Sequence, residues 1–330
     1  LGGMSGAQPK AAVICGAVCL IAETNLNAAR KRLDQGWLSE LYNEVDLVIP
    51  RVRKALKSKE AVSIGYHGNI VDLLSALDKE ELTPHLGSDQ TSLHNPWLGR
   101  YIPTGYSHEE AVELLRTSPD KFKLEVKRTL REHADLIRKL TKKGMYFWDY
   151  GNAFLLETSR AGADVLSPMS NRDFIYPSYV EDIMGPICFD YGFGPFRWVC
   201  TSGLDSDLAK TDEIAQRILS SQALNSTPDI KQQILDNIRW IDQANEHNLV
   251  VGSKARILYA DEIGRREIAS AFNKAIASGE ISSPIILGRD HHDVSGTDSP
   301  YRETANIKDG SMFTADMSVQ NFVGDSFRGA

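Results

Sequence analysis

The sequence of 330 residues lacks any apolar stretch of about 18 uncharged residues, the length that a membrane-spanning helix needs. It also lacks a signal peptide, a polybasic run and an aromatic-basic stripe, and its net charge at pH 7 is −7. An acidic chain of this kind is not suited to a nucleic acid or an anionic membrane surface. We therefore expect a cytoplasmic protein whose partner is a small molecule, with no nucleic acid and no membrane.

Cysteine is scarce, and its spacing contains no CxxC pair. The four cysteines stand in apolar runs: Cys15, Cys19, Cys188 and Cys200. They predict buried thiols in a reducing compartment. The one adjacent histidine pair, His291 and His292, would point to opposite faces of an extended segment. We therefore expect no bound metal.

The chain opens on a glycine-rich turn that runs into an apolar stretch and meets Glu23 about twenty residues later. Residues 4–15 predict a helix and residues 17–22 a strand, with Glu23 at its carboxyl end. Glycines let the backbone approach a pyrophosphate, the helix offers unpaired N–H groups, and a carboxylate accepts from ribose hydroxyls. The spacing indicates a dinucleotide site whose first strand would precede residue 1. A tight turn with a helix cap is the alternative.

Helical and strand-like segments alternate through the first half. Helical periodicity is expected over 33–57 and 107–143, strands over 61–66 and 145–152, a turn into a helix over 67–74, and a short strand with a polar loop over 84–90. This alternation predicts an α/β fold with a parallel sheet whose ligands bind at the carboxyl ends of the strands. Asn69, Gln90 and His94 should then lie on the same rim as the glycine turn and Glu23.

Between residues 168 and 195 the pattern breaks into Pro, Gly and aromatic residues. We place a domain boundary near Met184. A Rossmann-like domain, lacking its first strand, would cover 1–184, and part of a second α/β core domain would cover 185–330. In that second domain we expect helices over 206–223, 227–248 and 262–278, and strands over 254–259 and 284–288.

Residues 289–304 follow the last expected strand and hold two arginines, four acids and two histidines. Loops of this composition are where acid/base chemistry and carboxylate recognition are assembled. The alternative is a solvated loop with internal ion pairs.

Two other segments, one rigid and one polar, each allow two interpretations. Residues 192–198 surround Arg197 with Gly, Pro and aromatic residues, which fits a structural bend with the arginine stacked on a ring as well as a binding site. Residues 87–96 could donate hydrogen bonds to phosphates or a carboxamide, or form an Asx or ST turn before Pro96.

Together, the glycine turn and residues 88–94, 194–198 and 288–293 resemble the urocanase family, in order along essentially the whole chain. The resemblance implies NAD as cofactor. The positions that match the family's NAD contacts are Gly3, Met4, Ser5, Glu23, Asn69, Ile70, Gln90, Thr91, Ser92, Leu93, His94, Tyr101, Ile102 and Tyr150.

The resemblance also implies a hydro-lyase of histidine degradation that adds water to urocanate to give imidazolone propionate. NAD⁺ would act as an electrophile and emerge unchanged. We assign Arg302 to the substrate carboxylate, with Arg197 and Arg289 in reserve, because a guanidinium binds a carboxylate bidentately. Proton transfer is expected from Asp290, His292 or Asp293. A homodimer is the expected assembly.

The chain departs from the bacterial family pattern at three places. Leu258 follows Ala255, Arg256 and Ile257 where bacterial urocanases carry a cysteine, and we expect that thiol to be dispensable. Ala28 stands where the bacterial pattern has an NAD-contacting arginine. We also expect the chain to be a fragment that lacks both ends. An NAD-dependent dehydrogenase and a non-catalytic NAD-binding homologue are the alternative functions.

Overall fold

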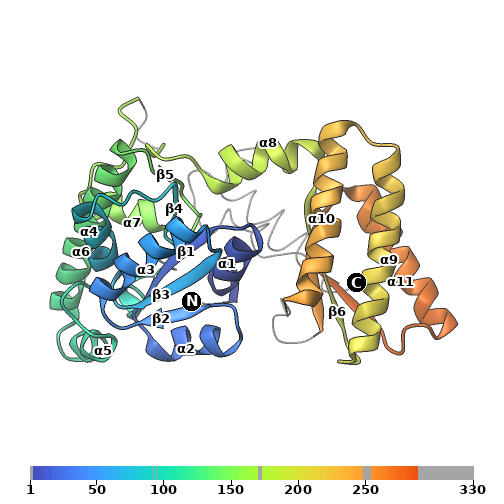
Figure 1. Cartoon of the computed structure of the whole chain (residues 1–330), viewed down its shortest axis with the longest axis horizontal. Helices are drawn as coiled ribbons and strands as arrows, with labels where there is room; N and C mark the ends of the chain where they lie inside the picture. The colour runs from blue at the N-terminus through green and yellow to red at the C-terminus, as the bar shows by residue number, and fades with distance from the viewer. Residues whose placement is uncertain (1–2, 92, 94, 170–172, 248–253, 289–330) are drawn as a thin grey trace. The chain divides into compact units, whose positions relative to one another are not determined.

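A computed structural model describes residues 3–91, 93, 95–169, 173–247 and 254–288. The chain divides into two compact units, Leu1–Ser178 and Tyr179–Ala330, whose described residues are coloured blue to green and yellow-green to orange in Figure 1. The division falls a few residues before Met184, and the boundary expected there remains a prediction.

A three-stranded parallel sheet in the order β1-β3-β2 organises the first unit. Its strands are β1 (Val18–Glu23), β2 (Glu40–Tyr42) and β3 (Val62–His67). The central strand β3 is buried at every position except its last, whereas β1 and β2 are half-buried throughout. Parallel pairing and buried apolar strands confirm the predicted α/β class.

Four helices surround this sheet: α1 (Gly3–Ile14), α2 (Leu26–Asp34), α3 (Val45–Ser58) and α4 (Ile70–Lys79). In Figure 1, α1 lies on one side of the sheet and α4 on the other. The helices α1 and α2 approach closely at Gly6, where a Cβ would lie 2.3 Å from Nε of Arg32 and would displace that side chain.

The continuous helical periodicity expected over residues 33–57 is wrong. The helix α2 ends at Asp34, β2 intervenes, and α3 begins at Val45. Three residues of strand are too short to change the periodicity of a helical window. Pairing with the free edge of β3 turns this segment into a strand.

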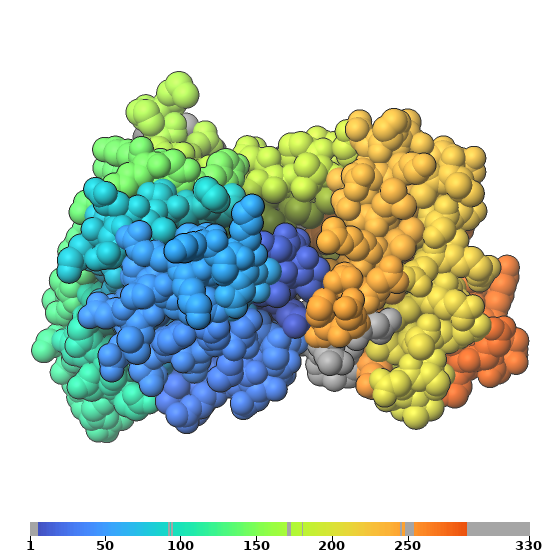
Figure 2. Space-filling view, viewed as in Figure 1, coloured from blue at the N-terminus to red at the C-terminus, as the bar shows by residue number. Residues whose placement is uncertain are grey.

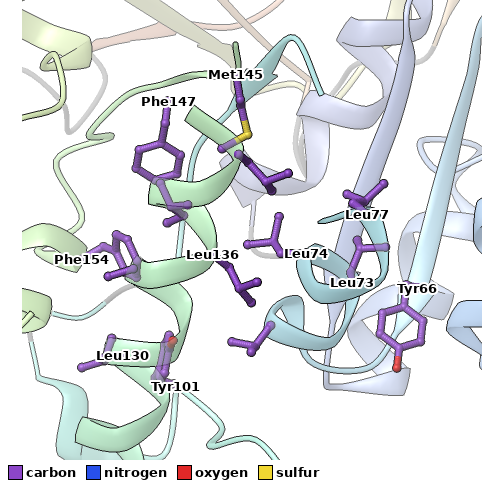
Figure 3. Packing of buried hydrophobic residues seen from close by; sticks show 14 of the residues in the cluster. Tyr66, Leu73, Leu74, Leu77, Tyr101, Leu130, Leu136, Met145, Phe147 and Phe154 are labelled. Atoms are coloured by element: carbon purple, nitrogen blue, oxygen red, sulfur yellow. The ribbon is translucent and has the colours of Figure 1, made fainter. Parts of the chain in front are cut away.

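The rest of the first unit is arranged around the long helix α6 (Pro119–Lys142), which packs against α4. It also contains β4 (Leu86–Gly87), η1 (Pro96–Leu98), α5 (His108–Thr117), β5 (Tyr146–Phe147) and α7 (Phe154–Arg160). Figure 3 shows Leu73, Leu74 and Leu77 of α4 on one side of this core, with Leu136 of α6 facing them and Leu130 beside Tyr101. Ser107 begins α5 with a capping box that includes Glu110.

An antiparallel sheet in the order β7-β6-β8 forms the second unit with three long helices. Its elements are η2 (Tyr179–Met184), α8 (Gly185–Ile187), η3 (Phe189–Tyr191), β6 (Gly194–Cys200), α9 (Asp205–Leu224), α10 (Pro228–Glu246), β7 (Ala255–Ala260), α11 (Glu262–Ser278) and β8 (Ile285–Gly288). In Figure 2, the long helices form most of the visible surface of this unit.

The bend considered for residues 192–198 is wrong, because most of this run belongs to β6, the central strand of the second sheet. Phe196, Trp198 and Cys200 alternate with less buried residues and point into the core. Trp198 is fully buried, donates its indole N–H to Oγ1 of Thr211 over 2.9 Å, and meets Phe272 edge-on with ring centroids 5.5 Å apart.

The expectation of four buried thiols holds only in part. Cys188 and Cys200 are buried and Cys19 is half-buried, and desolvation raises the pKa of Cys19 and of Cys188 to about 11. Cys15 is exposed, because α1 ends at Ile14 and the chain turns there toward β1.

A buried ion pair joins β7 to α9. The guanidinium of Arg256 donates from Nη2 to Oδ2 of Asp212 over 2.9 Å and from Nε to Oδ1 over 3.0 Å, and both side chains are almost fully enclosed. Removing one partner of such a pair leaves an uncompensated buried charge.

We expect Asp212→Ala to lower the free energy of unfolding by about 3–5 kcal/mol, because Arg256 would lose its counter-charge. Urea unfolding measures the change. The matched control is Glu213→Ala on the same helix, whose ion pair with Lys210 is exposed and should contribute under about 1 kcal/mol. A loss of less than about 1 kcal/mol in Asp212→Ala would contradict the prediction.

Candidate nucleotide-binding site

Glu23 and Asn69 lie at the same edge of the first sheet. The parallel register of β1 and β3 sets Glu23 opposite His67, so the two carboxyl ends coincide. Oε1 of Glu23 accepts from the backbone N–H of Asn25 over 2.8 Å. Asn69 follows β3 and caps α4, its Oδ1 accepting from the N–H of Val71 over 3.0 Å. The structure therefore brings these two predicted residues onto one rim.

Gly3, Met4 and Ser5 form the first turn of α1, so the glycine-rich segment is helical from its second glycine. The helix contacts β1 and β3. N–H groups in a first helical turn have no partner within the helix, and the helix dipole makes this end favourable for an anion.

Asn69 also connects the sheet to the segment around Tyr101. Its Nδ2 donates to the carbonyl of Ile102 over 2.8 Å, and the amide is buried. The side chain of Tyr101 is buried, and its hydroxyl shares a hydrogen bond with Nδ1 of His133, 3.1 Å away. The side-chain amide of Asn69 thus joins the start of α4, where Ile70 follows it, to Ile102, the residue after Tyr101.

His133 is a residue that sequence reasoning missed. It lies on the buried face of α6, with its ring centroid 4.7 Å from that of Phe154. Complete burial disfavours the imidazolium and lowers its pKa to about 3. The ring is therefore neutral at physiological pH and serves to hold the Tyr101 hydroxyl. Its position in the apolar repeat of α6 is the signal that could have identified it.

The loops that contain Gln90 and Tyr150 follow a separate sheet. Strands β4 and β5 pair with each other in parallel and are not hydrogen-bonded to the β1-β3-β2 sheet. Gln90 therefore follows a different hydrogen-bonded sheet from the one that ends at Glu23, and its place on the same rim stays a prediction. Gln90 follows β4 and Tyr150 follows β5, and these two strands end side by side.

Asp89 and Asn152 hold these two loops together. Oδ1 of Asp89 accepts from the N–H of Thr91 over 2.9 Å and from Nδ2 of Asn152 over 3.1 Å. The backbone N–H of Leu93 donates to the carbonyl of Asn152 over 2.9 Å. Leu93 is fully buried. Thr91 and Leu93 are consequently fixed by side-chain and backbone bonds within a largely buried network.

Gln90 carries a buried acceptor without a partner. Its Oε1 has no hydrogen-bond partner among the described residues. A buried, unsatisfied carbonyl oxygen costs free energy that a donor from a ligand would recover. This atom is the observation that best fits a bound group carrying N–H or O–H donors.

Seven predicted site residues lie outside the described part of the chain: Ser92, His94, Arg289, Asp290, His292, Asp293 and Arg302. Arg197 lies in β6 opposite Gly288, the last residue of β8. It therefore lies beside the last residue of β8, which directly precedes the polar run 289–304 in the sequence. Nε of Arg197 is buried without a hydrogen-bond partner among the described residues.

Leu258 is a core residue. It lies opposite Phe196 in the second sheet, and it is 2% exposed. The side chain packs among the apolar residues between the sheet and the long helices.

Two properties of the described residues concern other classes of site. No group of three His, Cys, Asp or Glu side chains within this part of the chain could hold a metal ion. Among the same residues, no helix combines the length and hydropathy needed to cross a membrane.

Comparison with known protein families gives a urocanase match to both parts of the chain. The family description "Urocanase Rossmann-like domain" matches residues 1–183, and "Urocanase C-terminal domain" matches residues 186–330. The chain belongs to the urocanase family. The resemblance seen in the sequence is thereby confirmed.

Curated relatives carry the name urocanate hydratase. The chain is 56% identical to the "Urocanate hydratase" of Mus musculus and 55% identical to that of Homo sapiens, over 337 residues in each case. It is 55% identical over 336 residues to the "Probable urocanate hydratase" of Dictyostelium discoideum. All of this chain is covered in these comparisons, and it spans about half the length of these relatives.

We expect the stability difference between Asp89→Asn and the wild type to depend on pH. Burial raises the pKa of Asp89 to about 6, from 3.8 in a solvated chain. The folded state therefore binds this proton more tightly, and its stability falls as pH rises from about 4 to about 6. Asparagine does not titrate, so the variant's free energy of unfolding does not fall in this way. Relative to wild type, the free energy of unfolding of the variant should rise by roughly 1–3 kcal/mol between pH 4 and pH 7.

Urea unfolding of both proteins at pH 4 and pH 7 tests this expectation. Because other carboxylates titrate equally in the two proteins, the difference isolates Asp89. A difference that is constant with pH would show that Asp89 titrates in the ordinary range.

Proposed function

We propose that the chain takes part in urocanate hydration, as the names of its relatives state for those proteins. The observation that carries this proposal is 55–56% identity to urocanate hydratases over the whole of this chain. Its Rossmann-like first part supports a nucleotide cofactor. We further propose that the nucleotide is NAD, and that the protein acts as a cytoplasmic homodimer.

The described residues fit a dinucleotide. The first turn of α1 would receive the pyrophosphate, and Glu23 at the end of β1 would accept from ribose hydroxyls. The orphaned Oε1 of Gln90 would accept from an N–H or O–H donor of the cofactor. When bound, NAD⁺ supplies an electrophilic ring that draws electron density from the substrate.

The remaining proposed NAD contacts surround these groups. They are Asn69 with Ile70, the segment from Thr91 to His94, Tyr101 with Ile102, and Tyr150. Asn69 and Ile102 are joined by a hydrogen bond, and Tyr101 is fixed by His133. These contacts pre-organise the surroundings of a ligand before it binds, which reduces the entropy lost on binding.

Arg197 and residues 289–304 would bind the substrate and transfer its protons. The guanidinium of Arg197, with its unpartnered buried Nε, would bind the propenoate carboxylate together with Arg302 or Arg289. Asp290, His292 or Asp293 would move protons to and from the substrate. The register of Arg197 with Gly288 supports this grouping, because Gly288 directly precedes Arg289 in the sequence.

The burial of Leu258 supports a mechanism without a thiol at that position. Its side chain lies in the apolar core opposite Phe196, where a cysteine would be desolvated and its thiolate disfavoured. The proposed chemistry therefore assigns no role to residue 258.

We expect Glu23→Ala to weaken NAD binding by about 1.5–3 kcal/mol, because a charge-assisted hydrogen bond to a ribose would be lost. Calorimetry with NAD measures the affinity. Glu44→Ala is the matched control, since Glu44 is exposed just beyond β2 at the same end of the sheet.

Glu23→Gln separates the charge from the structural contact, because it retains an acceptor for the N–H of Asn25. It should bind NAD with intermediate affinity. If Glu23→Ala and Glu44→Ala both bound NAD as the wild type does, Glu23 would have no role in cofactor binding.

We expect residues 1–330 alone to bind NAD poorly and to leave urocanate unchanged, whereas the chain extended to the length of its relatives should bind NAD and hydrate urocanate. The reason is that β1 pairs only with β3 among the described residues, so its other edge offers unpaired backbone groups beside the proposed site. Loss of urocanate absorbance measures hydration. Full activity of the short chain would refute this prediction, and an inactive extended chain would refute the proposed function.

A further inference from the structure

We propose that Asn152 is a positioning residue of the cofactor site, and that its side-chain amide holds residues 89–91 in the shape that receives the dinucleotide. This inference rests on the proposed function, because the site in question is the proposed NAD site.

The amide of Asn152 makes an unusual number of contacts for one group. Its Nδ2 lies 2.8 Å from the carbonyl of Asp89, 3.1 Å from Oδ1 of Asp89 and 2.8 Å from the carbonyl of Thr91. All three neighbours are acceptors, so only the NH₂ end of the amide can face them. The other end, Oδ1, accepts from the N–H of Phe154 at the start of α7.

These contacts hold the backbone on both sides of Gln90. Both residues that flank it present their carbonyl oxygens to the same NH₂ group. The backbone of Gln90 is therefore held on both sides, with its unpartnered Oε1 buried. The next segment is held in the same way, because the carbonyl of Asn152 accepts from Leu93 while its amide bonds Thr91.

The backbone around Asn152 is strained. Gly151 has φ of +84° and Ala153 has φ of +63°, a left-handed conformation that is unfavourable for alanine. Such strain persists where the surrounding contacts over-determine the backbone. Here Asn152 supplies contacts on both sides, to the 89–91 segment and to α7, while it is 6% exposed.

The test compares variants of the chain extended to the length of its relatives. Asn152→Asp has the same shape but replaces the NH₂ group by an oxygen that faces three acceptors. We expect it to weaken NAD affinity by about tenfold to a hundredfold. Asp89→Asn replaces the carboxylate by an amide that can donate to Thr91 Oγ1, and its NAD affinity is the reference for the double variant.

The double variant Asp89→Asn, Asn152→Asp separates the two parts of the effect. It removes the repulsion between adjacent carboxylates and leaves the carbonyls of Asp89 and Thr91 without their donor. We expect it to recover part of the affinity that Asn152→Asp loses.

Asn95→Asp is the matched control for charge. Asn95 is exposed and lies two residues beyond Leu93, and its Oδ1 accepts from the N–H of Trp97 and would remain an acceptor in aspartate. NAD affinity should change by less than about threefold.

Amide hydrogen exchange provides a readout that a general loss of stability would not give. In Asn152→Asp the N–H groups of Thr91 and Leu93 should exchange faster, while those of β3 should keep their protection. If Asn152→Asp does not fold, Asn152→Ser removes the donor without adding charge, and the same losses are expected.

Wild-type NAD affinity in Asn152→Asp, or in Asn152→Ser where that variant replaces it, would overturn the positioning role. An equal loss in Asn95→Asp would also overturn it, because charge alone would then explain the effect. A wild-type protein that binds no NAD would instead overturn the proposed function, which is a different result from NAD binding that survives the loss of Asn152.

Discussion

Parallel hydrogen bonding between β1 and β3 is the constraint on which the first unit depends. It places the carboxyl ends of both strands together, with Glu23 opposite His67 and Asn69 directly after. The register requires close packing around β3, since a Cβ at Gly65 would lie 2.5 Å from Cδ2 of Leu38. A shift of register would move the rim residues apart and exchange buried for exposed faces.

The sequence predicts the parts of this arrangement that depend on local pattern. The first helix, β1 with Glu23 at its end, and the turn from β3 into α4 occur within one or two residues of the expected positions. Each has a strong local signal, such as the apolar run of β3 or the cap at Asn69. The short strand β2 has no such signal and forms only because the edge of β3 is available.

Contacts between distant segments account for what the sequence does not predict. Asn152 meets Asp89 across 63 positions, and His133 meets Tyr101 across 32. In the second unit, β6 becomes a central strand because β7 and β8 pair with its two edges. The outer edge of β7 is covered by α10, where Trp240 donates to the carbonyl of Ile257 and Asn237 accepts from the N–H of Tyr259.

The buried polar groups of the candidate site differ in whether they have hydrogen-bond partners. Asn69, His133 and Asn152 have their hydrogen-bond partners within the protein, so each fixes a neighbouring segment. Gln90 differs, because its buried Oε1 has none among the described residues. Asn152 bonds the residues on both sides of Gln90, and a segment held in this way loses little conformational entropy when a ligand binds. In the proposed site, the bonds of Asn152 would supply pre-organisation, and a donor that satisfied Oε1 of Gln90 would add to the free energy of binding.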